Sequence, residues 1–485
     1  MNTQIRRAAA LVAVMFLALF AALTYVQFAK AGQLRADPRN SRAMYNSFDR
    51  DRGPIVVAGG DIIAQSKESD DAYGYQRIYA NGPLYAPVTG FFSVVGPPTG
   101  IEQTENDTLV GTSDTLFWTR IQDLFTGRRP RGGAVELAIE PAAQQAAWDA
   151  LGAQRGAVVA FDAKTGEILV MVSKPSFDPS VMAAHQPDQV QAAYQALEDD
   201  PNHPLFNRTI AGNLYAPGST FKLITTAAAL ESGQYTPATR LEAPRSLQLP
   251  NTSHQLTNFG EASCSASGQM TIAEALAVSC NTAFGQLGMD LGQNVLARQA
   301  EAFGFGKRLT VPLTVIPSSF PNGMDQAQTA MAAIGQYDVR VTPLQMAQVA
   351  GAMANDGIMM QPHLVRSTRD ADLNVLSTTG SSQLGRPVSA TTASQIKAMM
   401  IKTAESGTAT RAQVSGVTVG AKTGTAQKGA DQAPDVWTVG FGEAHGRTVA
   451  VAVVVEDGGA QGTGASGGAV AAPIMSQVLS AVFFS

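Results

Sequence analysis

The chain of 485 residues contains little histidine and almost no cysteine. Its five histidines are scattered singly and show no metal-ligand spacing, so the sequence predicts no metal site. Its two cysteines exclude a fold that depends on a dense disulfide framework. The 34 basic and 39 acidic residues give a net charge of −5, which argues against a surface for nucleic acid. The length is sufficient for two or more domains with a large core.

Long apolar runs are also scarce, with one clear exception near the N-terminus. An uncharged run extends from Ala8 to Ala29, directly after Arg6 and Arg7. The run is long enough to span a bilayer. A cleaved signal peptide is the alternative, but its apolar core is usually shorter, so we favour an uncleaved anchor. The two arginines suit a cytoplasmic tail, which places the rest of the chain outside the membrane.

The first of three chemically suggestive motifs is Ser219-Thr220-Phe221-Lys222. Pro217-Gly218 indicates a turn, and the apolar pattern over 220–230 predicts a buried helix behind it. Ser219 is therefore predicted at a helix N-terminus, where unpaired N–H groups and the helix dipole favour negative charge. Lys222 lies one turn further on the same face. A desolvated lysine has a lowered pKa and can take the serine proton, so we predict Ser219 as nucleophile and Lys222 as general base.

The second and third motifs follow in order along the chain. Ser279-Cys280-Asn281 comes after a helix-like run over 272–278, so the turn is expected to present the Ser279 hydroxyl and the Asn281 amide beside a cleft. Lys422-Thr423-Gly424-Thr425 continues an apolar strand that begins at Val417. Gly424 is expected to let a substrate strand lie close against the backbone.

Two further matches to these motifs have simpler interpretations. Lys164-Thr165-Gly166 lies between alternating apolar runs over 158–161 and 168–172, which predicts a hairpin turn. Ser394 and Lys397 repeat the serine-lysine spacing within an ordinary helical pattern that has no preceding Pro-Gly turn. A motif match needs the right structural context, so we predict no catalytic role for either segment.

The three motifs, in this order, resemble the signature of penicillin-binding proteins and serine β-lactamases. Residues 435–441 and 217–222 look like the corresponding segments of class B, or monofunctional, penicillin-binding proteins. Arg52-Gly53-Pro54-Ile55 resembles the beginning of their pedestal, although residues 56–60 replace the usual acid-arginine pair. The resemblance is strong from 156 onward, weak over 33–133, and closest to the actinobacterial penicillin-binding protein A group.

This resemblance implies an α/β fold of the α+β type. A transpeptidase domain with a central antiparallel sheet flanked by helices is expected over 151–485. A smaller β-rich pedestal is expected over 30–150, and a short tail with a single transmembrane helix over 1–29. The strand patterns on both sides of a large helical insert agree with this architecture.

The resemblance also implies an activity, that of a peptidoglycan D,D-transpeptidase. Ser219 is expected to attack the D-Ala-D-Ala amide of a stem peptide, form an acyl-enzyme and pass the acyl group to a neighbouring amine. By the same resemblance, the backbone N–H groups of Ser219 and Thr425 hold the oxyanion, and Lys422 and Thr423 attract the substrate carboxylate. No cofactor is implied. The implied partners are stem peptides, covalently inhibiting β-lactams and a membrane glycosyltransferase, at the cell membrane.

Several alternatives stay open at this point. The nearest are a D,D-carboxypeptidase and a serine β-lactamase, although the latter is normally smaller and class A members add a glutamate for deacylation. A β-lactam sensor or a silent division scaffold is disfavoured by the intact Ser219, Lys222 and Lys422. Cys264 and Cys280 form either a disulfide or two buried thiols.

Overall fold

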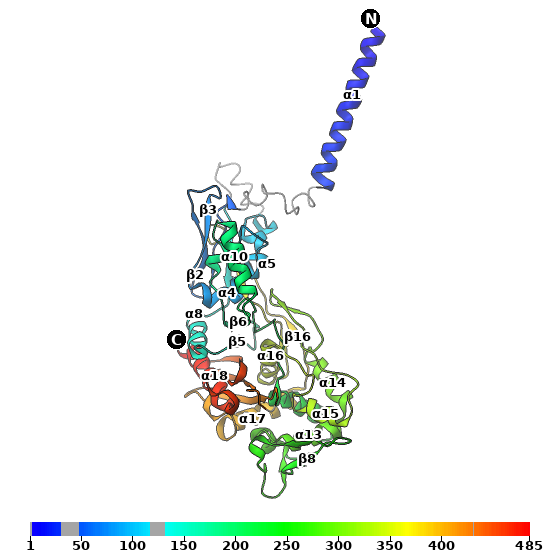
Figure 1. Cartoon of the computed structure of the whole chain (residues 1–485), viewed down its shortest axis with the longest axis vertical. Helices are drawn as coiled ribbons and strands as arrows, with labels where there is room; N and C mark the ends of the chain where they lie inside the picture. Colours follow the sequence, from blue (N-terminus) through cyan, green and yellow to red (C-terminus); the bar gives the residue numbers. More distant parts are fainter. Residues whose placement is uncertain (1, 31–47, 117–130, 430) are drawn as a thin grey trace.

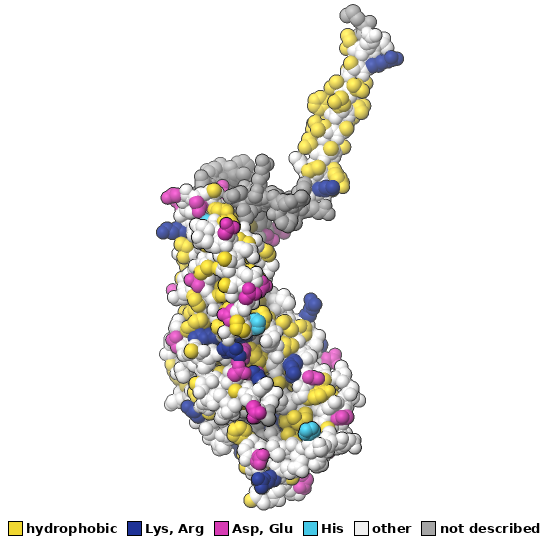
Figure 2. Space-filling model, viewed as in Figure 1, with side chains coloured by type: hydrophobic (Ala, Val, Ile, Leu, Met, Phe, Trp, Pro, Cys, Tyr) yellow, Lys and Arg dark blue, Asp and Glu magenta, His cyan; other side chains and the backbone are white. Residues whose placement is uncertain are grey.

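The computed structural model describes residues 2–30, 48–116, 131–429 and 431–485. Helix α1 (Asn2–Thr24) continues through a wider turn to Ala29 and extends away from the body of the molecule (Figure 1). Its side chains are exposed and mostly apolar (Figure 2), and residues Thr3–Ala29 have a mean hydropathy of 2.5. This helix is long and apolar enough to cross a membrane, as the sequence predicts.

The upper part of the body, which we call the pedestal, is built on a six-stranded sheet. Its order is β15-β14-β4-β1-β2-β3, and the β1 and β4 pair is parallel whereas the others are antiparallel. The strands are β1 (Ile55–Val56), β2 (Ile62–Glu68), β3 (Tyr75–Tyr79), β4 (Ala134–Leu137), β14 (Val365–Arg369) and β15 (Val375–Thr378). Two of the six strands therefore come from far along the chain, within the range predicted for the transpeptidase domain.

The pedestal also contains helices that the sequence analysis did not predict. They are α4 (Gly82–Thr89), α5 (Gly100–Thr104), α6 (Asn106–Leu109), α9 (Pro179–Met182) and α10 (Pro187–Glu198). A largely aromatic cluster includes residues of α4, α9 and α10, and in it Phe48 is stacked on Phe92 at 4.3 Å between ring centroids. The description "β-rich" is thus correct for the sheet but incomplete for the module as a whole.

The larger, lower part is built on a five-stranded sheet in the order β17-β18-β19-β5-β6, with every neighbouring pair antiparallel. The strands are β5 (Gly156–Asp162), β6 (Ile168–Lys174), β17 (Thr418–Ala426), β18 (Asp435–Ala444) and β19 (Arg447–Val455). Helices cover both of its faces, which explains why strands β5, β6 and β19 are buried along almost their whole length. The predicted fold class is confirmed.

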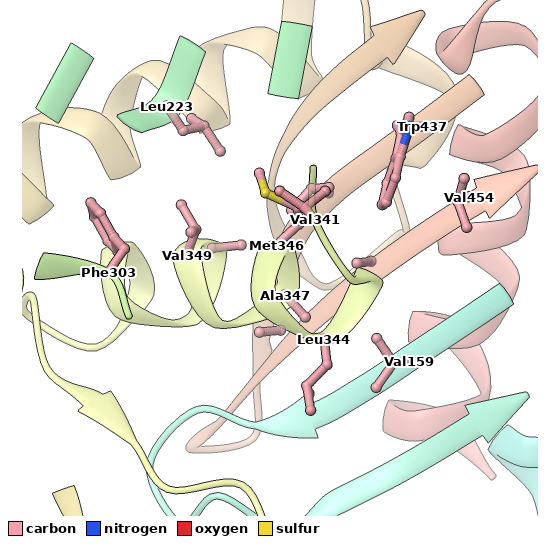
Figure 3. Packing of buried hydrophobic residues seen from close by; sticks show 14 of the residues in the cluster. Val159, Leu223, Phe303, Val341, Leu344, Met346, Ala347, Val349, Trp437 and Val454 are labelled. Atoms are coloured by element: carbon pink, nitrogen blue, oxygen red, sulfur yellow. The ribbon is translucent and has the colours of Figure 1, made fainter. Parts of the chain in front are cut away.

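Alternate side chains of each strand enter different cores because the strand pleat has a period of two. Val159 of β5 faces helix α16 (Pro343–Ala354), where Leu344 and Ala347 pack over the sheet (Figure 3). Val158 belongs to the second core, between the opposite face and helices α8 (Pro141–Leu151) and α18 (Gly467–Phe484). Helix α18 is apolar enough to resemble a membrane span, but its packing between α8 and the sheet makes it a core helix.

The segment between β6 and β17 supplies the helices around the catalytic motifs. They are α11 (Lys222–Glu231), α12 (Ile272–Ala277), α13 (Asn281–Leu291), α14 (Gln293–Ala302), α15 (Gln326–Ala333), α16 and α17 (Ala390–Ser406). Four two-stranded pieces complete this segment: β7 (Arg240–Glu242) with β10 (Gln269–Thr271), β8 (Ser246–Gln248) with β9 (Gln255–Thr257), β11 (Leu309–Thr310) with β12 (Thr314–Val315), and β13 (Met359–Met360) with β16 (Gln383–Gly385). The edge strand β17 faces this helical region, and the three motifs meet there.

Candidate active site

Ser219 lies in a tight turn that leads directly into a helix. A 3₁₀ turn over Gly218–Phe221 continues into α11, so the predicted helix N-terminus is present. Gly218 has a φ of +53°, a left-handed conformation that glycine adopts without steric strain. Its N–H donates to the carbonyl of Gly335 at 2.9 Å, which fixes the turn from outside. The Ser219 side chain is half-buried and lines a large cleft.

Lys222 begins α11 and is completely buried beneath this turn. Its Nζ donates to the Ser279 carbonyl oxygen at 2.8 Å, to Asn281 Oδ1 at 2.8 Å and to Ser279 Oγ at 3.4 Å. The first and second predicted motifs are therefore joined through this one nitrogen. Its three acceptors are uncharged oxygens, which satisfy hydrogen bonds without compensating the charge of an ammonium group.

Lys422 approaches the same hydroxyl from the sheet. Its Nζ donates to Ser279 Oγ at 2.8 Å and to the Thr423 carbonyl oxygen at 2.8 Å. Ser279 adopts a positive φ of 63°, unusual for serine, between α12 and α13. This conformation places its hydroxyl between the two lysine nitrogens. The three motifs thus converge on Ser279 Oγ.

Burial changes the acid-base properties of both lysines. Both side chains are fully buried, and desolvation disfavours a charged ammonium group. Burial lowers the pKa of Lys422 to about 7. Burial, together with the nearby Lys422 charge, holds the pKa of Lys222 well below its ordinary value of 10.5. A neutral amine is therefore accessible at this site near neutral pH, which is the form required of a general base.

The third motif lies on the edge strand β17, beside the nucleophile turn. A Cβ atom at Gly424 would meet the Pro217 carbonyl oxygen at 2.9 Å and Thr220 Cγ2 at 3.0 Å. Gly424 is therefore required for the close approach of β17 to the turn, in addition to the substrate-side role that the sequence analysis gave it. Thr423 Oγ1 lies 2.6 Å from Thr408 Oγ1, which fixes the threonine hydroxyl at the cleft.

A cleft of about 1390 Å³ runs over these residues. Six predicted site residues line it: Ser219, Ser279, Asn281, Thr423, Gly424 and Thr425. The two lysines lie beneath its floor, which separates them from solvent. All eight predicted catalytic and substrate-binding residues are therefore brought together by the fold.

Cys264 and Cys280 are joined by a disulfide, with their Cα atoms 5.8 Å apart. The bridge spans 16 positions and ties a loop at the cleft rim to the centre of the second motif. Of the two interpretations that the sequence left open, the structure has the disulfide.

The two motif duplicates lie outside the site. Lys164-Thr165-Gly166 forms the turn between β5 and β6, so the hairpin prediction is confirmed. Ser394 is exposed on α17, and Lys397 Nζ pairs with Glu443 Oε2 at 2.7 Å. Within the ranges given above for the structure, no three histidine, cysteine, aspartate or glutamate side chains cluster as metal ligands.

Two residues that support the site were missed by the sequence analysis. Asn258 accepts hydrogen bonds at the start of α13, and Thr408 contacts Thr423. Both lie in irregular segments outside the motifs, so no local sequence pattern marks them. Trp437, within the strand whose resemblance was noted, donates from Nε1 to the Ala216 carbonyl oxygen at 3.1 Å. It thereby links β18 to the nucleophile turn.

Comparison with known proteins agrees with this geometry. Residues 156–480, well over half of the chain, match the family model described as the penicillin binding protein transpeptidase domain. The chain belongs to the penicillin-binding protein transpeptidase family. Residues 52–135 also match the penicillin binding protein A dimerisation domain, which confirms the finer resemblance of the pedestal.

Relatives within the penicillin-binding protein family match over nearly the full length. The peptidoglycan D,D-transpeptidase PbpA of Mycolicibacterium smegmatis is 45% identical over 98% of this chain and 97% of its own. The ceftriaxone acyl-enzyme of penicillin-binding protein A from Mycobacterium tuberculosis superposes with a TM-score of 0.87 and 41% identity, covering 90% of this chain and 100% of that one. The penicillin G acyl-enzyme of the same protein gives a TM-score of 0.84 and 42% identity, over 89% and 99% of the two chains.

Proposed function

We propose that this protein is a peptidoglycan D,D-transpeptidase that acts through an acyl-enzyme on Ser219 and is covalently inhibited by β-lactams. One observation carries the proposal. Ser279 Oγ lies 2.8 Å from Lys422 Nζ and 3.4 Å from Lys222 Nζ, both buried, at a cleft that Ser219 also lines. The near full-length relatives named as D,D-transpeptidases, and the β-lactam acyl-enzymes of one of them, support the same reaction.

In the first half of the reaction, Lys222 acts as general base and takes the proton of Ser219 Oγ. The oxygen forms a bond to the carbonyl carbon of the penultimate D-alanine, and the backbone N–H groups of Ser219 and Thr425 hold the oxyanion. The amide C–N bond then breaks. Ser279 Oγ, which is hydrogen bonded to Lys422 and lies 3.4 Å from Lys222 Nζ, gives its proton to the departing D-alanine nitrogen. It takes in return the proton that Lys222 gained from Ser219, so Ser279 is a hydroxyl again and Lys222 is a neutral amine again.

In the second half, an amine of a neighbouring stem peptide attacks the ester carbon. By the reverse of the first relay, the attacking amine loses a proton to Lys222 through Ser279 Oγ, and Lys222 returns it to Ser219 Oγ as the C–O bond to Ser219 breaks. A new amide cross-link is formed, and the enzyme is restored. A β-lactam enters the same first half through its ring amide. Its leaving nitrogen stays attached to the acyl group after ring opening, so the group that should depart remains in the cleft and the enzyme is blocked.

Thr423 and Lys422 are assigned to the substrate carboxylate. Thr423 lines the cleft, and its hydroxyl is fixed by Thr408 at 2.6 Å. Lys422 is the neighbouring residue, is buried, and supplies positive charge when its amine is protonated. A hydroxyl at the cleft with a cation nearby provides both the hydrogen bond and the field that a carboxylate requires.

We further assign the chain to the cell membrane as a single-pass protein with its catalytic part on the extracytoplasmic side. Two features support this topology: the apolar helix over Thr3–Ala29, which carries Arg6 and Arg7 near its N-terminal end, and the disulfide at the cleft. A transpeptidase consumes stem peptides on glycan strands, so a membrane glycosyltransferase that makes those strands is the expected partner.

Replacement of the nucleophile tests the proposed function. Ser219→Ala should abolish covalent labelling by a fluorescent penicillin, because it removes the proposed nucleophile, which lies at the turn that leads into α11 and lines the cleft. Ser394→Ala is the matched control, since it removes the other serine with the same lysine spacing, and it should label like the parent. Labelling that survives in Ser219→Ala would contradict the assignment. Mass analysis of the labelled peptide identifies the acylated residue in either case.

A further inference from the structure

Asn258 connects the cleft-rim loop with the start of α13. Its side chain is only 7% exposed and uses its whole hydrogen-bonding capacity. Oδ1 accepts from the backbone N–H of Asn281 at 2.9 Å and of Thr282 at 3.1 Å. Nδ2 lies within hydrogen-bond distance of the carbonyl oxygens of Pro244, Arg245 and Ala262, at 3.2–3.4 Å.

Helix α13 needs such a partner because its own N-cap residue provides none. The first N–H groups of a helix have no partner within the helix, and a side-chain oxygen at the N-cap usually accepts one of them. The N-cap of α13 is Cys280, which makes no side-chain cap hydrogen bond and has its sulfur in the disulfide. Asn258 supplies the missing acceptor from 22 residues upstream of the N-cap.

The first residue of that helix is Asn281 of the second motif. Its side chain is held at both ends: Oδ1 accepts from Lys222 Nζ at 2.8 Å, and Nδ2 donates to the Thr257 carbonyl oxygen at 3.0 Å. Residues 257 and 258 therefore fix both the side chain and the backbone of Asn281. A displacement of Thr257 and Asn258 would therefore move Asn281 and alter its hydrogen bond with Lys222 Nζ.

Ser279 adds a reason for this external support. Its positive φ is a strained conformation for a non-glycine residue and persists only where neighbouring contacts enforce it. On one side, α12 accepts from the N–H groups of Ser279 and Cys280. On the other side, the hydrogen bonds of Asn258 hold α13.

We propose that Asn258 is a positioning residue of the active site: by capping α13 from outside the helix, it holds Asn281, and through Asn281 it holds Lys222, in the arrangement needed for acylation. Asn258 does not act on the substrate itself. The proposal rests on the function proposed above, because acylation of Ser219 is the step that it supports.

A double-mutant cycle tests this role in the full-length protein. Asn258→Ala should lower the rate constant for acylation by a fluorescent penicillin by roughly tenfold to a hundredfold, since a misplacement of about 1 Å in an active site has that effect. If Asn258 acts through Asn281, the same change in an Asn281→Ala background should lower the rate only about two- to threefold, because coupled residues are not additive. Equal losses in both backgrounds would overturn the proposal, and so would an Asn258→Ala rate within twofold of the parent.

A second cap provides the matched control. Ser389 accepts from the Thr392 N–H at the start of α17. Ser389→Ala should lower the unfolding temperature as any lost cap does, with no change in the acylation rate of the folded protein. A rate loss in Ser389→Ala that equals the loss in Asn258→Ala would show that general destabilisation is responsible, which overturns the proposal.

The labelling results distinguish a wrong proposed function from a wrong positioning role. If the parent protein itself is not labelled, the function is wrong, whereas a labelled parent with an unaffected Asn258→Ala variant refutes only the positioning role. Should Asn258→Ala not fold, the cycle is run with Asn258→Leu, which has a similar side-chain volume but no oxygen to accept from the N–H groups of Asn281 and Thr282. The same non-additivity with Asn281→Ala is expected.

Discussion

The catalytic cleft and the pedestal both bury charged side chains, but they neutralise them in opposite ways. In the pedestal, Glu102 is fully buried between two buried arginines, with Oε2 at 2.5 Å from Arg52 Nε and Oε1 at 2.7 Å from Arg77 Nε. In the cleft, Lys222 and Lys422 are equally buried, and all their hydrogen-bond partners among the described residues are uncharged oxygens.

The pKa values follow this difference. Burial alone would raise the pKa of Glu102, but Arg77 and Arg52 hold it below its ordinary value of 4.5, so the carboxylate stays charged. Burial without a counter-ion lowers the pKa of Lys422 to about 7 and the pKa of Lys222 well below 10.5. A buried charge with an oppositely charged partner stays ionised and takes part in a structural ion pair. A buried lysine without such a partner has a lowered pKa and can act as a base.

Lys222→Met tests the role of the buried lysine in the cleft and has the largest expected effect. The change keeps the length and apolar packing of the side chain but removes the proposed base, so the acylation rate should fall by about 10³-fold or more. Thermal unfolding should be unchanged or occur at a higher temperature, because an uncompensated buried amine is removed. Labelling kinetics and thermal denaturation measure the two effects. Lys397→Met changes the lysine that repeats the serine-lysine spacing on α17, and it should leave labelling intact.

Glu102→Gln tests the role of the buried ion pairs in the pedestal. It leaves two buried guanidinium groups without a counter-charge, which should reduce the free energy of unfolding by about 3–5 kcal/mol. The protein that remains folded should still be acylated at the parent rate, because Arg52, Arg77 and Glu102 lie in the pedestal and do not line the cleft. Urea denaturation and labelling at low temperature test these statements.

The control for the pedestal change is Glu68→Gln on the exposed side of β2. It should change the unfolding free energy by less than about 0.5 kcal/mol, as surface substitutions usually do. A comparable loss in both variants would mean that pairing by Arg52 and Arg77 does not explain the stability.

Removal of the disulfide tests whether a covalent restraint at the cleft affects stability, acylation or both. The double variant Cys264→Ser, Cys280→Ser should lose about 3 kcal/mol of unfolding free energy, since the bridge closes a short loop. Acylation should also slow, because Cys280 lies between Ser279 and Asn281. Denaturation and labelling of the variant measure both effects. An acylation rate equal to that of the parent would confine the disulfide to a purely stabilising role.

The pH dependence of acylation tests the proposed charge on Lys422. Lys422 is proposed to attract the substrate carboxylate as a cation, so its pKa of about 7 predicts that the second-order rate constant falls as the pH rises through that value. The decrease should be about tenfold per pH unit once Lys422 is largely neutral. Lys422→Arg carries a permanent charge and should lose this decrease, whatever its absolute rate. A decrease that persists at the same pH in Lys422→Arg would assign it to another group.

The pedestal was harder to foresee from the sequence than the transpeptidase sheet. The segments that form β5, β6 and β17 are apolar runs next to turn signals or the third motif, and their predicted positions are confirmed. Strand β14 pairs with β4, more than 200 residues earlier in the chain, and β15 extends the sheet by pairing with β14. Such pairing depends on the three-dimensional path of the chain, because a strand's own sequence does not specify a distant partner. The short helices α5 and α6 are likewise stabilised by tertiary packing more than by their own sequences.

The sequence by itself determined the order of the three motifs, the helix behind Ser219, the strand that carries Lys422 and the apolar run at the N-terminus. These follow from local periodicity, turn chemistry and length, which act between near neighbours in the chain. Only the tertiary structure decided that Ser279 Oγ lies between two lysines, that burial lowers the pKa of both lysines, and that Asn258 caps α13. Distances, desolvation and capping from another segment depend on residues as far apart in the chain as Ser279 and Lys422, 143 positions, meeting in space. No local pattern encodes that meeting.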